Sequence, residues 1–265
     1  MLIIGERINS TRLKTREAIG SRDALFIAKE AHGQFKAGAR ILDVNCAMAL
    51  ENEPDDIDWV IGIIRREVPS AGICVDSPNH LAIARALKAY DGKGEIFINS
   101  ITADEDRMAK IVPLALEYGA NLIALVMDES GMPNTRQERR SVAERILKAV
   151  KKYNFDEKKL YFDPLIRPLA TEPEQADEFL GSIALIRSLG AVKTVCGLSN
   201  ISFGLPKRSL INASFLNLAL ASGLDAAIMD PLDRAVIRSL WATEAVSGRD
   251  KYCKNYIAAF REGRL

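Results

Sequence analysis

Eight short apolar runs alternate with eight longer segments of helical periodicity along the 265 residues, and this alternation predicts an α/β fold. The runs are continuously apolar, as in Ile96-Phe97-Ile98, which is typical of parallel strands that are buried on both faces. No stretch of linker composition interrupts the pattern. Eight such units without a break predict a (β/α)8 barrel, the TIM barrel, as a single domain over residues 1–265.

The expected strands are short and rich in apolar and β-branched residues. They are residues 2–8, 41–45, 72–77, 95–100, 122–128, 160–165, 193–200 and 225–231. The expected helices carry apolar residues at positions i, i+3, i+4 and i+7, as Ile57, Val60, Ile61 and Ile64 do. They are residues 23–37, 55–68, 81–89, 105–118, 138–153, 173–189, 209–222 and 233–247. Residues 252–265 are expected to form an appendage to the barrel.

An open, doubly wound sheet is the competing fold. Its dinucleotide-binding form needs a G-x-G-x-x-G motif after the first strand, and this sequence has no such motif there. A phosphate-binding G-x-x-x-x-G-K-[ST] loop is also missing from the sequence. The barrel is therefore the preferred architecture.

The charge balance argues against nucleic acid and membrane partners. Lys and Arg number 36 and Asp and Glu number 35, so the net charge of +1 provides no dominant field for either polyanion. No run of about 18 apolar residues occurs, and the first residues do not resemble a secretory signal, so we expect a cytoplasmic protein. The four cysteines are widely separated, which indicates neither a zinc ribbon nor a disulfide framework.

Polar residues mark the ends of almost all the expected strands, and the carboxyl ends of the strands form the active site in this fold. These residues are Glu6, Asn9, Asp43, Asn45, Asp76, Asn99, Asp128, Asp163, Ser199, Asn200 and Asp230. For Asp128 and Asp230, a role as N-cap of the next helix explains the residue equally well. Asp76 and Asn99 are each followed by a serine, Ser77 and Ser100, which is the better candidate for a cap.

Several carboxylates and amides with few cations favour a flat, nitrogen-rich heterocycle, since Asp accepts paired N–H bonds and Asn both donates and accepts. A phosphate-rich ligand needs Lys, Arg or a glycine-rich turn instead. A divalent metal is the competing explanation for clustered carboxylates. The chain has only two histidines, His32 and His80, both on expected helices, so we expect no metal site.

The sequence resembles the pterin-binding methyltransferases, which move a methyl group between tetrahydrofolate and a corrinoid protein and include the folate domain of cobalamin-dependent methionine synthase. The resemblance rests on six short motifs in order at successive strand ends. They are Ile4-Gly5-Glu6-Arg7-Ile8-Asn9, Ile41-Leu42-Asp43-Val44-Asn45, Val75-Asp76-Ser77, Ile98-Asn99-Ser100, Phe162-Asp163-Pro164 and Gly197-Leu198-Ser199-Asn200-Ile201-Ser202. The family's corrinoid/iron–sulfur protein methyltransferases tend to have Gln where this chain has Phe203, and Ser-Phe-Gly-Leu-Pro looks closer to methionine synthase.

The resemblance implies a role for each of these residues. Asp76, Asn99 and Asp163 are expected to bind the edge of the pterin ring, and Asn200 to lie beside N5 as the catalytic residue. The further pocket positions implied by the resemblance are Glu6, Asp43, Asn45, Ser199 and Arg208. A hydrogen bond from Asn200 that strengthens as N5 gains a proton stabilises the transition state without titration of the amide.

The resemblance also implies the substrates and partners. Tetrahydrofolate or 5-methyltetrahydrofolate is the expected substrate, and we expect a corrinoid (cobalamin) to arrive on a separate protein because no D-x-H-x-x-G motif occurs in the sequence. A homodimer is expected from the relatives. The direction of methyl transfer stays open. Three alternatives also stay open: a dihydropteroate synthase-like condensing enzyme, a non-catalytic subunit that binds folate or docks a corrinoid protein, and a metal-dependent barrel enzyme.

Overall fold

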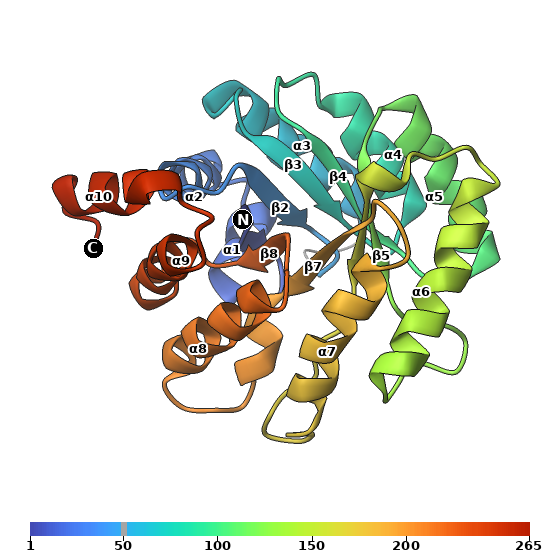
Figure 1. Ribbon diagram of the computed structural model, residues 1–265. Helices are drawn as coiled ribbons and strands as arrows, with labels where there is room; N and C mark the ends of the chain where they lie inside the picture. Colours follow the sequence, from blue (N-terminus) through green and yellow to red (C-terminus); the bar gives the residue numbers. More distant parts are fainter. Residues whose placement is uncertain (49–51) are drawn as a thin grey trace.

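The computed structural model describes residues 1–48 and 52–265, and it confirms the predicted barrel. Eight parallel strands pair in chain order and close into one barrel, with the helices forming an outer ring (Figure 1). The strands are β1 (Leu2–Asn9), β2 (Ile41–Asn45), β3 (Gly72–Asp76), β4 (Ile96–Ile101), β5 (Asn121–Leu125), β6 (Leu160–Asp163), β7 (Lys193–Gly197) and β8 (Ala226–Met229).

Each predicted helix is present, with ends that differ by a few residues from the sequence expectation. The helices that follow the strands are α2 (Ala24–Lys36), α3 (Glu53–Glu67), α4 (His80–Ala89), α5 (Glu105–Glu117), α6 (Arg136–Lys151), α7 (Gln175–Arg187), α8 (Arg208–Ala221) and α9 (Arg234–Val246). Two helices were not predicted, α1 (Leu13–Gly20) and α10 (Lys254–Arg261). Short 3-10 turns are η1 (Glu157–Lys159), η2 (Leu198–Ser202) and η3 (Lys251–Cys253).

The side chains that fill the barrel alternate along each strand with those that face the helices. The inward-facing layer consists of Ile4, Ile41, Cys74, Phe97, Ile123, Tyr161, Val195 and Ala226. Side chains two positions further along a strand point to the same face. The next inward layer, at the carboxyl end, therefore contains the predicted polar residues Glu6, Asp43, Asp76, Asn99 and Asp163.

Strand β1 contains a bulge that brings two polar residues to this end of the barrel. The pairing of β1 with β2 shifts between Gly5 and Ile8. Gln34 of α2 fills the bulge, where its Oε1 accepts the backbone N–H of Arg7 at 3.0 Å. Because a bulge inserts an extra residue, Glu6 before it and Asn9 after it reach the same side of the sheet.

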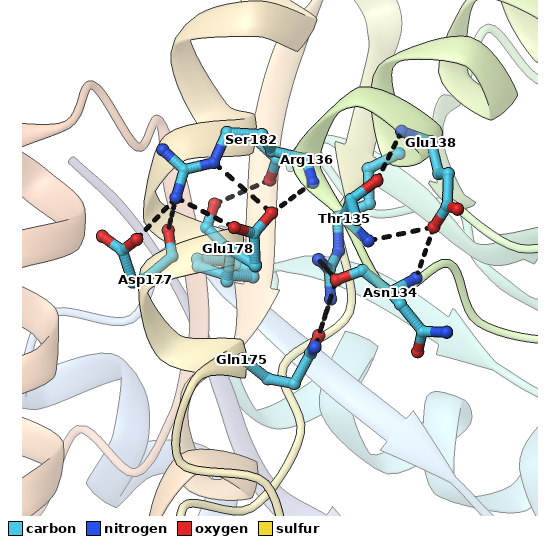
Figure 2. Close-up of polar contacts among 10 residues, drawn as sticks. Asn134, Thr135, Arg136, Glu138, Gln175, Asp177, Glu178 and Ser182 are labelled. Carbon is cyan, nitrogen blue, oxygen red and sulfur yellow. Dashed lines mark hydrogen bonds and ion pairs between the residues drawn. The ribbon is translucent and has the colours of Figure 1, made fainter.

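The N-terminal ends of α6 and α7 are joined by a polar network (Figure 2). Thr135 and Glu138 form a capping box on α6, in which each side chain accepts from the other residue's backbone. The guanidinium of Arg136 reaches across to Asp177 at 2.5 Å and Glu178 at 3.1 Å. Helix N-termini follow the carboxyl ends of the strands, so these contacts fix the rim of the barrel mouth.

Among the described residues, none of the helices combines the length and the apolar composition needed to cross a bilayer.

Candidate functional site

Asp76 and Asn99 lie opposite each other at the ends of neighbouring strands. They are register partners in the pairing of β3 with β4. The Nδ2 of Asn45, at the end of β2, donates to Asp76 Oδ2 at 3.0 Å. Burial raises the pKa of Asp76, whereas the Asn45 bond and the charge of Arg107 favour its ionised form.

Asp43 lies in the same inward-facing layer, on β2, and is 1% exposed. Burial raises the pKa of this carboxyl well above its ordinary value, and the neighbouring charge of Asp76 raises it further. Within the pair the pKa of Asp43 is raised more strongly, because Asn45 and Arg107 favour the charge on Asp76. Its Oδ1 is buried without a hydrogen-bond partner among the described residues.

Asp163 ends β6 on the same inward face. Burial raises its pKa from 3.8 to about 6, although the backbone N–H of Leu165 donates to Oδ1 at 2.8 Å and favours the carboxylate. Leu165 has a φ of +65°, a left-handed conformation that turns the chain back toward the Asp163 side chain. Behind it, the buried guanidinium of Arg139 donates from Nε to the Pro164 carbonyl at 2.8 Å.

Asn200 was expected at the end of a strand, and this expectation is wrong in detail. β7 ends at Gly197, and Asn200 lies in the following 3-10 turn, η2. Its side chain is exposed and folds back over the strand end. The position is shown by its distance from Gly197, where an added Cβ would lie 3.0 Å from Asn200 Nδ2. The turn directs Asn200 toward the barrel mouth more effectively than a strand would, since alternate strand residues face the helices.

A cleft of about 540 Å³ opens beside Asn200 at the mouth of the barrel. Its wall includes Glu6 and Asn9 from β1, Ser199 and Asn200 from η2, and Arg208 at the start of α8. The Ser199 hydroxyl donates to Glu6 Oε1 at 2.7 Å. Burial raises the pKa of Glu6, while the Ser199 bond opposes the shift.

Arg208 holds the η2 turn in place. Its Nη2 donates to the Ser199 carbonyl at 2.6 Å, and its Nε donates to Ser202 Oγ at 3.0 Å. The guanidinium therefore holds the backbone of Ser199 before Asn200 and the side chain of Ser202 after it.

The predicted residues thus form two groups at one end of the barrel. Glu6, Ser199, Asn200 and Arg208 line the cleft on the β1 and β7 side. The second group lies across the interior on other strands and does not line that cleft. It consists of Asp43, Asn45, Asp76, Asn99 and Asp163. The two groups adjoin at Glu6, whose charge raises the pKa of Asp43.

The helix caps are residues other than the candidates considered from the sequence. Asp128 and Asp230 do not cap α6 and α9; the side chains of Thr135 and Asp233 do. Likewise α4 and α5 are capped by Asn79 and Asp104, not by the serines that follow Asp76 and Asn99. Asp230 instead accepts from Arg7 at 2.7 Å, and Asp128 pairs with Arg145.

Two further residues of the site did not emerge from the sequence. Asn212 of α8 lines the cleft, is 8% exposed, and has an Oδ1 with no hydrogen-bond partner among the described residues. Arg107 of α5 donates to the carbonyls of Ser100 at 2.6 Å and Ser77 at 3.0 Å, which joins the end of β4 to the loop after β3. For Asn212 the available signal was an amide four residues after Arg208 on an apolar helix.

The inward-facing groups are mainly hydrogen-bond acceptors, and within residues 1–48 and 52–265 no donor reaches the buried Asp43 Oδ1. This donor-poor interior fits a planar ligand that brings its own N–H groups. Within residues 1–48 and 52–265, no three His, Cys, Asp or Glu side chains are grouped as metal ligands.

Comparison with known proteins identifies the family. A model of the pterin binding enzyme family matches residues 5–230. The chain belongs to the pterin-binding enzyme family. This confirms the resemblance drawn from the six strand-end motifs.

Two curated relatives are methyltransferases or contain such a domain. A methylcorrinoid:tetrahydrofolate methyltransferase of Eubacterium limosum is 32% identical over 268 residues, which cover 100% of this chain and 98% of that protein. A methionine synthase of Mycobacterium leprae is 32% identical over 243 residues, which cover 86% of this chain and 20% of that protein. This pterin-binding chain therefore corresponds to a whole protein in the first case and to about a fifth of one in the second.

Solved structures of dihydropteroate synthases share the fold. The enzyme of Xanthomonas albilineans in complex with 7,8-dihydropteroate superimposes with a TM-score of 0.68 at 20% identity, over 93% of this chain and 92% of that one. The enzyme of Vibrio fischeri ES114 gives 0.68 at 17% identity, over 92% of both chains. At this identity the likeness concerns the barrel and not the reaction.

Proposed function

We propose that this protein transfers a methyl group between N5 of tetrahydrofolate and the cobalt of a corrinoid carried by a separate protein. The observation that carries the proposal is the position of Asn200 beside a layer of inward-facing carboxylates and amides. The full-length similarity to a methylcorrinoid:tetrahydrofolate methyltransferase supports it. Residues 1–265 act in this proposal as one pterin-binding domain.

In this proposal the pterin ring lies in the barrel mouth with its edge toward Asp76, Asn99 and Asp163. Ionised Asp76 and Asp163 accept ring and amino N–H groups, and Asn99 serves either kind of partner. Neutral Asp43 and the amide of Asn45 support Asp76. Glu6, Ser199 and Arg208 complete the wall next to Asn200.

Asn200 is proposed to act on N5. A methyl group on a neutral tertiary amine has a poor leaving group, so N5 must gain positive character before the carbon–nitrogen bond breaks. An amide in hydrogen-bond contact with N5 stabilises that change without titrating itself. The exposed position of Asn200 at the mouth keeps N5 accessible from outside the barrel.

The corrinoid supplies the nucleophilic or methyl-carrying cobalt when its protein docks at the mouth. This chain contributes binding and orientation of the folate, which bring N5 and the methyl group into line. Phe203, 67% exposed at the end of η2, lies on the surface that such a partner would meet. The expectation of a homodimer stays a prediction, which light scattering of the purified protein measures.

The decisive experiment mixes the protein with tetrahydrofolate and methylcobalamin under anaerobic conditions and follows the cobalt absorbance. We expect demethylation of methylcobalamin in step with formation of 5-methyltetrahydrofolate, and the reverse reaction from 5-methyltetrahydrofolate and reduced cobalamin. Asn200→Ala should lower the single-turnover rate about 100-fold, the usual scale for loss of a group that assists proton transfer.

The exposed Asn255 of α10 provides the matched control, and Asn255→Ala should keep the wild-type rate. Wild-type protein that binds folate but transfers no methyl group to either corrinoid form overturns the proposed reaction and favours a non-catalytic subunit. Formation of dihydropteroate from the pterin diphosphate and aminobenzoate overturns it in favour of a condensing enzyme.

A further inference from the structure

Asn200 does not titrate, so the proton that N5 gains or loses needs another holder. The carboxyl groups on the wall of the cleft are those of Glu6, Asp230 and Asp233. Asp230 is engaged in ion pairs with Arg7 at 2.7 Å and Arg12 at 3.6 Å. Asp233 is the N-cap of α9 and accepts two backbone N–H groups. Among the described residues, Glu6 forms no ion pair within 4 Å and caps no helix; its side-chain partner is Ser199.

Glu6 is joined to Asn200 through one residue. Its Oε1 accepts the hydroxyl of Ser199, the neighbour of Asn200 in η2, at 2.7 Å. A hydroxyl that accepts one proton and passes on its own connects a carboxyl group to a second acceptor. The Ser199 backbone is fixed by Arg208, whose Nη2 donates to its carbonyl at 2.6 Å.

We propose that Glu6 is the proton donor and acceptor for N5, acting through the Ser199 hydroxyl. The inference rests on the proposed methyl transfer. When 5-methyltetrahydrofolate gives up its methyl group, Glu6 gives its proton to Ser199 Oγ and the Ser199 proton passes to N5. The carbon–nitrogen electron pair stays on N5, the methyl group goes to cobalt, and Glu6 is left as a carboxylate. In the opposite direction each proton moves back.

The surroundings of Glu6 suit a group that must hold and release a proton. Burial raises its pKa from the ordinary value, and the negative charge of Asp230 raises it further. The Ser199 bond and the charges of Arg12 and Arg208 act in the opposite direction. On the neighbouring strand β2, burial and the charge of Asp76 raise the pKa of Asp43 well above its ordinary value. Because some neighbouring groups raise the pKa of Glu6 and others lower it, both the protonated and the ionised forms of Glu6 have stabilising neighbours.

The test is the pH dependence of single-turnover methyl transfer from saturating 5-methyltetrahydrofolate to reduced cobalamin. Wild-type protein should lose rate about tenfold per pH unit once Glu6 ionises. Glu6→Gln should lower the rate about 100-fold at low pH and flatten this dependence. Glu6→Asp, which keeps a carboxyl group, should restore the pH dependence at a reduced rate. Glu117→Gln, at the exposed end of α5, is the matched control and should match wild type.

The Ser199→Ala variant tests the route. The double variant Glu6→Gln/Ser199→Ala should have a rate within about threefold of each single variant. The rate losses do not multiply when two residues act as one unit. An unchanged pH profile in Glu6→Gln, with wild type active, overturns the role of Glu6 and leaves the methyl transfer intact. If Glu6→Gln binds folate more weakly but keeps the wild-type pH profile at saturation, Glu6 serves binding alone. That result also overturns its proposed role in proton transfer. An inactive wild type overturns both proposals.

Discussion

The Ser199 hydroxyl donates a 2.7 Å hydrogen bond to the Glu6 carboxylate, although 193 positions separate the two residues in the chain. Glu6 belongs to the first strand, and Ser199 to the turn after the seventh. β8 pairs with both β1 and β7, so closure of the barrel brings them together. The cleft beside Asn200 therefore exists only when the last unit of the barrel has docked against the first.

Asp163→Asn should remove a pH dependence from folate binding. Burial raises the Asp163 pKa to about 6, and a carboxylate that accepts pterin N–H groups must be ionised. The affinity for tetrahydrofolate should therefore fall about tenfold per unit as the pH drops below this value. Calorimetric titrations of wild type between about pH 5 and about pH 8 measure this slope, and Asp163→Asn should lack it.

The same shift predicts a change in stability. Native Asp163 holds its proton more tightly than the unfolded chain does, since its pKa rises from 3.8 to about 6. The resulting stabilisation is complete at a pH below the pKa of Asp163 in the unfolded chain. It is lost as the pH rises through the pKa in the native protein, which lowers the free energy of unfolding by about 3 kcal/mol. Urea unfolding of wild type across this range should show the loss, and Asp163→Asn should not. Equal slopes for the two proteins would contradict the buried position of this carboxyl group.

The sequence predicts the barrel and its polar layer for a physical reason. Strand periodicity is local, so Asp76, Asn99 and Asp163 at the ends of apolar runs were assigned to the mouth correctly. The turn that carries Asn200 was not predicted, because Leu198 and Ile201 are as apolar as a strand continuation and the 3-10 geometry depends on Arg208. Asn212 was not predicted because its burial depends on the cleft formed by barrel closure.

Gly5→Ala should destabilise the protein and disturb the site. A Cβ at Gly5 would lie 2.4 Å from Gln34 Oε1, the oxygen that accepts the Arg7 N–H in the bulge of β1. We expect a loss of about 2 kcal/mol from overpacking and the broken hydrogen bond. Gly62→Ala, in the helix α3 with no atom within 4 Å of the new Cβ, is the control and should stabilise by about 1 kcal/mol. Urea unfolding measures both changes, and equal effects would show that the bulge is not tightly packed.

Arg139→Met should loosen the rim around Asp163. The Arg139 side chain is fully buried and donates to the Pro164 carbonyl, to the Asn134 carbonyl at 3.2 Å and to Gln175 Oε1 at 2.7 Å. Asn134 and Gln175 belong to the network that joins α6 to α7 (Figure 2). Unpaired acceptors should cost about 3 kcal/mol in stability. The adjacent, exposed Arg140 gives the control, since Arg140→Met removes only a surface pair and should cost less than about 0.5 kcal/mol.

Asp43→Asn tests whether the most buried carboxyl group of the site is neutral. Burial and the charge of Asp76 raise the Asp43 pKa well above its ordinary value, which favours the protonated form of the native group. A neutral amide of the same shape should then be tolerated at pH 7 with a loss of less than about 1 kcal/mol. The stabilisation that comes from the raised pKa is lost in wild type as the pH rises through the native value. The variant should lack this loss and become the more stable protein at high pH.

Urea unfolding of Asp43→Asn from pH 6 to pH 9 compares the two proteins, and Asp43→Ala separates charge from packing. The alanine variant removes the carboxyl group without replacing its volume, so it should be destabilised at every pH by about 2 kcal/mol. Suppose instead that Asp43 is ionised at pH 7 and stabilised by its neighbours. Asp43→Asn would then be as destabilising as Asp43→Ala, and stability would fall with acid in wild type only. That outcome would transfer the neutral role to Asp76.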